Sequence, residues 1–242
     1  MWGWLVAPID PTRAHEIGQA MAWHGRIMIV AWAILAPLAV MTARFFKIMP
    51  GQDWPHDLDN TIWWRSHWIG QSAVLFLTLI GMGLVLPIDR FSIHAVFGIA
   101  VGVGVLLQVL LGYFRGSKGG PTAPGPGGSM RGHHYDMTPW RRIFETLHKS
   151  LGYGLLLISI GAAVSGLWMA NAPNWMWLAL ALWWIVLVIL FIHLQRRGLA
   201  VDTYQAIWGN DPAHPGNRRP APGWGVRRPG TAQERDGNVR DD

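Results

Sequence analysis

The stretch AWHGRIMIVAW, Ala22–Trp32, opens an apolar run that continues to Ala43. It places His24 and Arg26 at the start of a segment long enough to cross a bilayer, which takes about 20 residues. An ionisable side chain in or at the edge of a bilayer span is costly unless it has a partner. The partner of His24 is therefore the first question that the sequence raises.

Five segments are long and apolar enough to cross a bilayer, and they lie near residues 22–44, 64–86, 91–113, 145–169 and 174–194. The connection LPIDRFS is so tight that it predicts an antiparallel hairpin of the second and third segments, and the short link NAPNW joins the last two. Tryptophans flank the segment ends, as in the aromatic belts of membrane proteins. We predict an all-α, polytopic membrane bundle of about five transmembrane helices.

The composition supports a membrane protein and excludes several kinds of site. Of the 242 residues, 51% are hydrophobic and only 14% are charged. Because the chain has no cysteine, disulfides, thiolate metal sites and the covalent attachment of c-type haem are excluded. Any haem would be held non-covalently.

The basic residues are distributed unevenly across the expected membrane. Of the 20 Lys and Arg residues, only Arg13, Arg26 and Arg90 fall on the side of the N-terminus. The positive-inside rule then places the N-terminus outside and the C-terminus in the cytoplasm. The net charge of +6 thus reflects topology, and we expect a bacterial inner-membrane protein without a nucleic-acid partner.

The membrane segments divide the chain into three parts. Residues 1–21 do not resemble a cleaved signal peptide, and Trp2 and Trp4 indicate a periplasmic, interfacial segment. Residues 22–196 form the predicted membrane domain, with a Gly- and Pro-rich cytoplasmic loop over 115–139. Residues 197–242 are rich in Pro, Gly and Arg and are expected to be a disordered cytoplasmic tail.

One histidine stands near the start of each of the first four segments: His24, His67, His94 and His148. Because successive helices alternate in direction, His24 and His94 lie toward one membrane face, and His67 and His148 lie toward the other. At the rise per residue of an α-helix, the two levels differ by about 22 Å. Two sites fit within a hydrocarbon core about 30 Å thick.

Each histidine pair has the chemistry of a haem site. Neutral imidazole is a good iron ligand, and a helix bundle can hold a cofactor between facing helices. Two imidazoles complete the coordination of a haem, which then transfers electrons and has no open position for oxygen. One turn after His94 and His148, Gly98 and Gly152 leave room for a flat ring. Three cations beside the histidines could pair with haem propionates, namely Arg26, Arg65 and Lys149.

Other interpretations of these residues stay open. The glycines are also typical of helix packing in membranes, and the cations could simply extend toward the membrane surface. His193 is a competing ligand for the pair of His67 and His148. His133, His134 and Asp136 could bind a metal or a polar substrate from the loop. A scheme with two ligands on one helix would need His134 and His148, which Pro139 separates.

Four stretches resemble the eukaryotic-type cytochrome b561 fold, particularly the version associated with DOMON domains. They read WHGRIMIVAWAILAPLAVMTARFFK, WWRSHWIGQ, SIHAVFGIAVGVGVLLQ and ETLHKSLGYGLLL, and the loop motifs RGSKGG and HHYDMTPWRRIFE look like those of bacterial members. The resemblance implies that His24/His94 and His67/His148 each ligate one haem b. It also implies electron transfer across a membrane, often from ascorbate or a protein-bound haem. The chain has five predicted helices where the vesicle ascorbate enzymes have six, so we do not infer ascorbate as its substrate. The N-terminal extension is too short for a DOMON domain.

We therefore expect a di-haem electron carrier, of oxidoreductase class if it turns over alone. Its partners would be membrane lipid, a periplasmic redox protein, and a cytoplasmic or quinone partner. The alternative is an accessory haem-binding or structural subunit of a larger respiratory complex. A solute transporter is disfavoured, because the ionisable residues cluster near the ends of the segments.

Overall fold

The computed structural model describes residues 2–86, 91–115, 139–221 and 223–230. The predicted turn between the second and third segments lies mostly outside these ranges. So do His133, His134, Asp136 and most of the loop predicted over 115–139.

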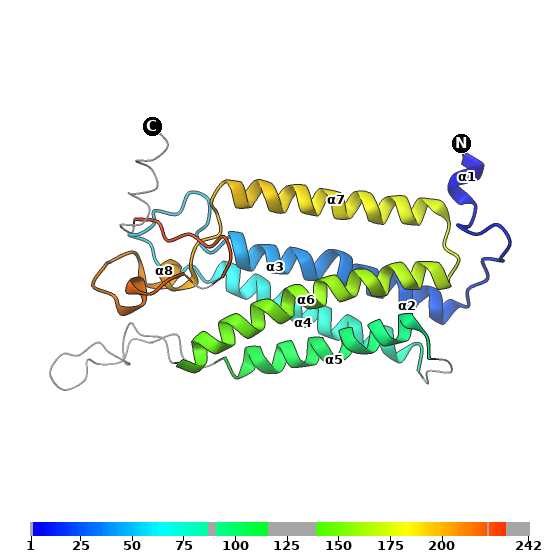
Figure 1. Ribbon diagram of the computed structural model, residues 1–242, viewed down its shortest axis with the longest axis horizontal. Coiled ribbons are helices and arrows are strands. Elements are labelled where there is room, and N and C mark those ends of the chain that lie inside the picture. The colour runs from blue at the N-terminus through cyan, green and yellow to red at the C-terminus, as the bar shows by residue number, and fades with distance from the viewer. Residues whose placement is uncertain (1, 87–90, 116–138, 222, 231–242) are drawn as a thin grey trace. The chain divides into compact units, whose positions relative to one another are not determined.

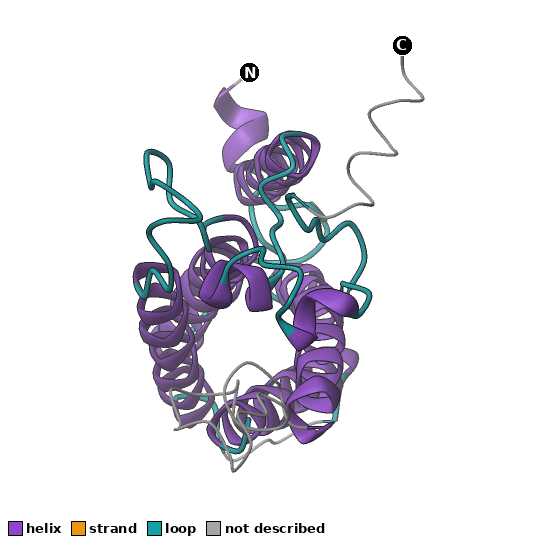
Figure 2. Ribbon diagram, turned by 90° about the vertical axis from the view of Figure 1, so that its left-hand side faces the viewer, coloured by secondary structure: helices purple, strands orange, loops and turns teal. Residues whose placement is uncertain are grey.

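The described residues form helices and loops without a strand, which confirms the all-α prediction (Figures 1 and 2). The first long helix is continuous over Gln19–Phe45; it comprises α2 (Gln19–Ile29), a π-helical stretch η1 (Val30–Leu35) and α3 (Ala36–Phe45). The other long helices are α4 (Ile62–Gly83), α5 (Ile93–Tyr113), α6 (Pro139–Met169) and α7 (Asn174–Arg196). Short helices are α1 (Trp2–Val6), α8 (Thr203–Trp208) and the 3-10 turn η2 (Pro215–Arg218).

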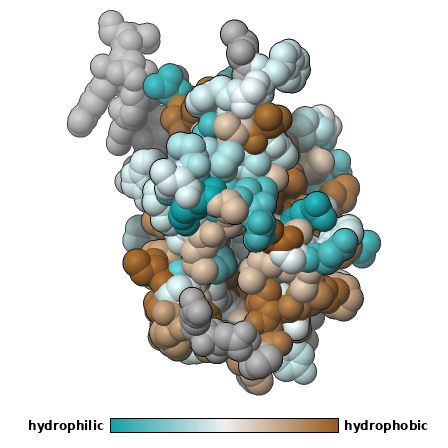
Figure 3. Space-filling view, turned by 90° about the vertical axis from the view of Figure 1, so that its right-hand side faces the viewer, coloured by the Kyte–Doolittle hydropathy of each residue, from teal (hydrophilic) through white to brown (hydrophobic). Residues whose placement is uncertain are grey.

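Four of the five long helices in the described residues are long and apolar enough to span a membrane, namely Gln19–Phe45, α5, α6 and α7. Helix α4, with 22 residues, is not among these four, and Arg65, His67 and Gln71 lie in its first half. Apolar side chains along the helices are exposed, including Leu110 at 53% and Ile189 at 61%, and Figure 3 shows hydrophobic side chains reaching the surface of one face beside hydrophilic ones. By length and hydropathy, the chain is a multi-pass membrane protein.

The chain divides into two compact units, and each long helix contributes residues to both. The first unit comprises residues 1–40, 68–110 and 151–191, and the second comprises 41–67, 111–150 and 192–242. His24 and His94 belong to the first unit, whereas His67 and His148 belong to the second.

Small residues bring the helices of the first unit into close contact. A Cβ on Gly81 of α4 would lie 2.8 Å from Met28 Sδ of α2, and one on Gly102 of α5 would lie 2.7 Å from Met82 Sδ of α4. Helices α5 and α6 meet in the same way at Gly104 and Leu155. A buried core of Ala31, Ala36, Val74 and Val105 lies among these helices. Helices α2, α4, α5 and α6 therefore pack in chain order.

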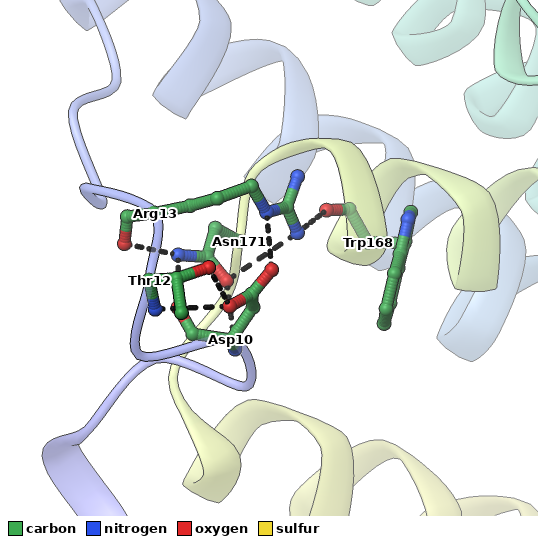
Figure 4. A network of polar contacts seen from close by, with 5 residues as sticks. All are labelled: Asp10, Thr12, Arg13, Trp168 and Asn171. Carbon is green, nitrogen blue, oxygen red and sulfur yellow. Dashed lines mark hydrogen bonds and ion pairs between the residues drawn. The ribbon is translucent and has the colours of Figure 1, made fainter.

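The N-terminal segment is fastened to the turn between α6 and α7, within the first unit. Asn171 donates to the Asp10 and Arg13 carbonyls at 3.0 and 2.7 Å, and Arg13 donates to the Trp168 carbonyl at 3.0 Å (Figure 4). Hydrogen bonds from Thr12 and the ion pair with Arg13 lower the pKa of Asp10. Asn171 has φ 46°, a left-handed conformation that asparagine tolerates. These bonds hold residues 10–13 at one end of α6.

The second unit contains a folded C-terminal segment. Lys47 Nζ donates to the Val201 carbonyl at 2.8 Å, and the Asp59 amide donates to the Ala206 carbonyl at 3.2 Å. Asp202 caps α8 and pairs with Arg228 at 2.6 Å. Residues 203–207 are buried. A short buried helix thus lies within the Pro-, Gly- and Arg-rich sequence for which disorder is expected.

Candidate functional site

The structure brings the four histidines together as two pairs. His24 of α2 faces His94 of α5, with ring centroids 5.9 Å apart and ring planes at 90°. His67 of α4 faces His148 of α6, with centroids 6.2 Å apart and planes at 80°. Each pair joins alternate long helices, as the sequence pattern predicts.

Backbone carbonyls orient both rings of the first pair. His24 Nδ1 lies 2.8 Å from the Gly81 carbonyl oxygen, and His94 Nδ1 lies 3.0 Å from that of Ala162. A carbonyl can only accept a hydrogen bond, so Nδ1 carries the proton in each ring. The Nε2 atoms then keep their lone pairs, which is the usual arrangement of a metal-binding histidine.

Aromatic and charged side chains surround the second pair. The Phe144 ring stacks on His148 with centroids 5.0 Å apart and an interplanar angle of 29°. Glu145 is buried and contacts Arg141 and Lys149, each at 3.3 Å. The guanidinium of Arg141 in turn lies 4.9 Å from the Phe144 ring centroid. A buried carboxylate requires such pairing, because an isolated buried charge is very costly.

The predicted accessory residues have different surroundings. No atom lies within 4 Å of a Cβ built on Gly98, whereas one on Gly152 would lie 3.4 Å from Gln108 Nε2. Gly98 thus leaves open space one turn after His94. Among the cations, Lys149 pairs with Glu145, Arg26 lies over the Trp23 ring at 5.1 Å, and Arg65 is exposed.

The remaining histidines in the described residues lie elsewhere. His193 is exposed in the last turn of α7. His15 Nδ1 lies 2.7 Å from the Ala170 carbonyl oxygen, and His56 lies 3.4 Å from Asp53. Within the described ranges, no three His, Asp or Glu side chains are grouped to hold a metal ion. The histidines therefore form candidate ligand pairs, the number that a haem iron with four porphyrin nitrogens would take.

Several residues that contact or lie beside the histidines are not predicted from the sequence. The ion pairs of Arg141, Glu145 and Lys149 follow a four-residue spacing on one helix, which is a readable signal. In contrast, the contacts of Gly81 with His24 and of Ala162 with His94 span 57 and 68 residues. No local pattern marks them.

Two curated proteins are similar to the chain. One, "Putative ferric-chelate reductase 1" of Xenopus laevis, is 28% identical over 153 residues, which are 60% of this chain and 22% of that protein. The other, a cytochrome b561, DM13 and DOMON domain-containing protein of Arabidopsis thaliana, is 24% identical over 192 residues, which are 75% of this chain and 19% of that protein. The chain spans about a fifth of the length of these relatives.

No protein-family model matches the chain. No solved structure matches it either. The chain is thus distantly similar to cytochrome b561-domain and ferric-chelate reductase proteins.

Proposed function

We propose that this protein transfers electrons across a membrane through two b-type haems. His24 and His94 would hold one haem, and His67 and His148 would hold the other. The observation that carries the proposal is the meeting of four histidines as two pairs from alternate helices. The distant similarity to b561-domain proteins supports the same function.

The residues fit a haem held by two histidines. With metal–nitrogen bonds near 2 Å, two imidazole rings that shared one metal ion would have centroids about 6 Å apart. The observed centroid distances are 5.9 and 6.2 Å. In the first pair, the protonated Nδ1 atoms also leave both Nε2 atoms as the metal-binding nitrogens.

A bound haem with two histidine ligands would supply reversible one-electron chemistry without an open coordination position. The protein would orient the ligands, in the first pair through carbonyls of neighbouring helices and in the second through Phe144 and the ion pairs of Glu145. Gly98 and Gly152 would leave room for the ring, and Arg26, Arg65 and Lys149 would pair with propionates.

The expected exchange partners follow from the sequence-based topology. A periplasmic redox protein would meet the His24/His94 side of a bacterial inner membrane, and a cytoplasmic or quinone partner would meet the other side. The name of the Xenopus relative adds a ferric chelate to the acceptors worth testing.

The proposal is tested on the purified full chain supplemented with haem during expression. We expect two haems per chain, with reduced absorption bands of the b type. In vesicles, an impermeant reductant outside should then reduce ferricyanide trapped inside. Protein without b-type bands would contradict the haem sites, and haem-loaded vesicles without transfer would contradict the transmembrane function.

A further inference from the structure

One turn of α6 contacts the ring of His94 at three positions. The Ala162 carbonyl oxygen lies 3.0 Å from His94 Nδ1, and Ser165 Oγ lies 3.4 Å from the same atom. A Cβ added to Gly166 would lie 2.9 Å from His94 Cε1 and 3.2 Å from Nδ1. Positions 162, 165 and 166 together form the surface on which the ring lies, and we call them the α6 turn.

Ala162 and Ser165 determine which ring nitrogen carries the proton. Ser165 Oγ lies 2.7 Å from the Gly161 carbonyl oxygen and 3.1 Å from that of Ala162, so its hydroxyl donates to the α6 backbone. The lone pairs of Oγ are then available to His94 Nδ1–H, whose main acceptor is the Ala162 carbonyl. Both contacts favour a proton on Nδ1 and a lone pair on Nε2.

Gly166 determines how closely the ring can approach α6. Only a residue without Cβ permits this approach, since real Cβ atoms essentially never come within 3.0 Å of a heavy atom outside their own stretch of backbone. The contact is specific to this glycine. A Cβ on Gly154, also on α6, would meet no atom within 4 Å, and one on Gly81, beside His24, would meet Met28 and Ile27.

We propose that the α6 turn is the positioning element of His94. Gly166 sets the distance and tilt of the ring, while Ala162 and Ser165 present Nε2 to the group shared with His24. This inference rests on the proposed function, because it concerns the same histidine pair. It adds that the reduction potential of the haem proposed at His24 and His94 depends on α6, a helix that contributes no ligand to that haem.

The main test compares Gly166→Ala with Gly154→Ala in the haem-loaded full chain. The first substitution should shift the potential and the low-spin EPR signal of one haem, or release that haem, while leaving the other unchanged. The second is the matched control and should alter neither. Two unaltered components in Gly166→Ala would overturn the proposal.

Ser165→Ala keeps the test informative if Gly166→Ala does not fold. It adds no atom beside the ring, and it should shift the potential of the same haem while retaining both haems. Ser165→Thr, which keeps the hydroxyl, should have a potential close to that of the wild type. An unchanged potential in Ser165→Ala would overturn the role of the hydroxyl.

A measurement on the haem-free protein separates this inference from the proposed function. Imidazole ¹⁵N spectra should show His94 protonated on Nδ1 in the wild type, with altered shifts in Gly166→Ala and unaltered shifts in Gly154→Ala. If no variant bound haem, the proposed function would fail, yet these spectra would still test the α6 turn. A His94 protonated on Nε2 would overturn it.

Discussion

The two histidine pairs have similar ring distances but different surroundings. In the first pair, His24 and His94 bind the carbonyls of Gly81 and Ala162. In the second pair, His148 stacks on Phe144 one residue from the buried, ion-paired Glu145. The backbone thus orients one pair, while charged and aromatic side chains surround the other. We expect changes in packing to alter the reduction potential of the haem at the first pair, and changes in charge to alter that of the haem at the second pair.

The largest effect is expected from removing a ligand. His94→Ala and His148→Ala should each lower the haem content from two to about one per chain, because each variant lacks one of the two imidazoles proposed to hold one haem. Pyridine haemochrome assays against protein concentration measure this content. His193→Ala is the control, since His193 is exposed and outside both pairs. A loss of haem in that variant would support His193 as a ligand and contradict the pairing.

A change of charge should distinguish the second pair from the first. Glu145→Gln leaves the buried Arg141 without its carboxylate partner and should destabilise the protein by about 3 kcal/mol. The loss of a negative charge favours the reduced form, so the potential of the haem proposed at His67 and His148 should rise while that of the other stays constant. Redox titration measures both potentials, and Asp53→Asn, at an exposed carboxylate, is the control. Equal shifts of both haems would contradict the difference between the pairs.

The second unit should also give a specific pH dependence of stability. Burial, with help from Lys149 and Arg44, lowers the pKa of Lys47 to about 7, while Asp202 and Glu145 oppose the shift. Below pH 7 both states are protonated, and the buried charge destabilises the fold fully. As the pH rises above 7, only the unfolded chain keeps the proton, so stability increases by about 1 kcal/mol per pH unit.

This pH dependence is measured by thermal unfolding between pH 7 and 9, compared with Lys47→Met. The unfolding midpoint of the wild type should rise more steeply with pH than that of the variant. Parallel curves would show that Lys47 titrates normally in the folded protein.

The smallest effect is expected at Gln205, which is fully buried in α8. Among the described residues, neither side-chain atom Oε1 nor Nε2 has a hydrogen-bond partner. Gln205→Met should therefore raise the free energy of unfolding by about 1 kcal/mol. In the control Gln52→Met, the amide bonded to the Asp57 carbonyl at 2.7 Å is lost, and stability should fall. Destabilisation by Gln205→Met would reveal a partner of the Gln205 amide.

Much of the membrane fold can be predicted from the sequence, because the hydropathy and length of a helix depend only on one continuous stretch of residues. The long helices lie where apolar runs predict them, and α6 begins earlier because Pro139 suits a first helical turn. The histidine pairs follow from alternating helix direction alone. Helix α8 is not predicted, since its burial depends on contacts such as Lys47 with Val201, 154 residues apart. For the same reason, no local pattern indicates that Gly166 contacts His94.

The most direct test of the central claim is a redox titration followed by visible spectra, on the wild type and on His94→Ala and His148→Ala. We predict two b-type components in the wild type, with a different component missing from each variant and the remaining one near its original potential. Loss of both components in either folded variant, or of the same component in both, would contradict two independent two-histidine sites.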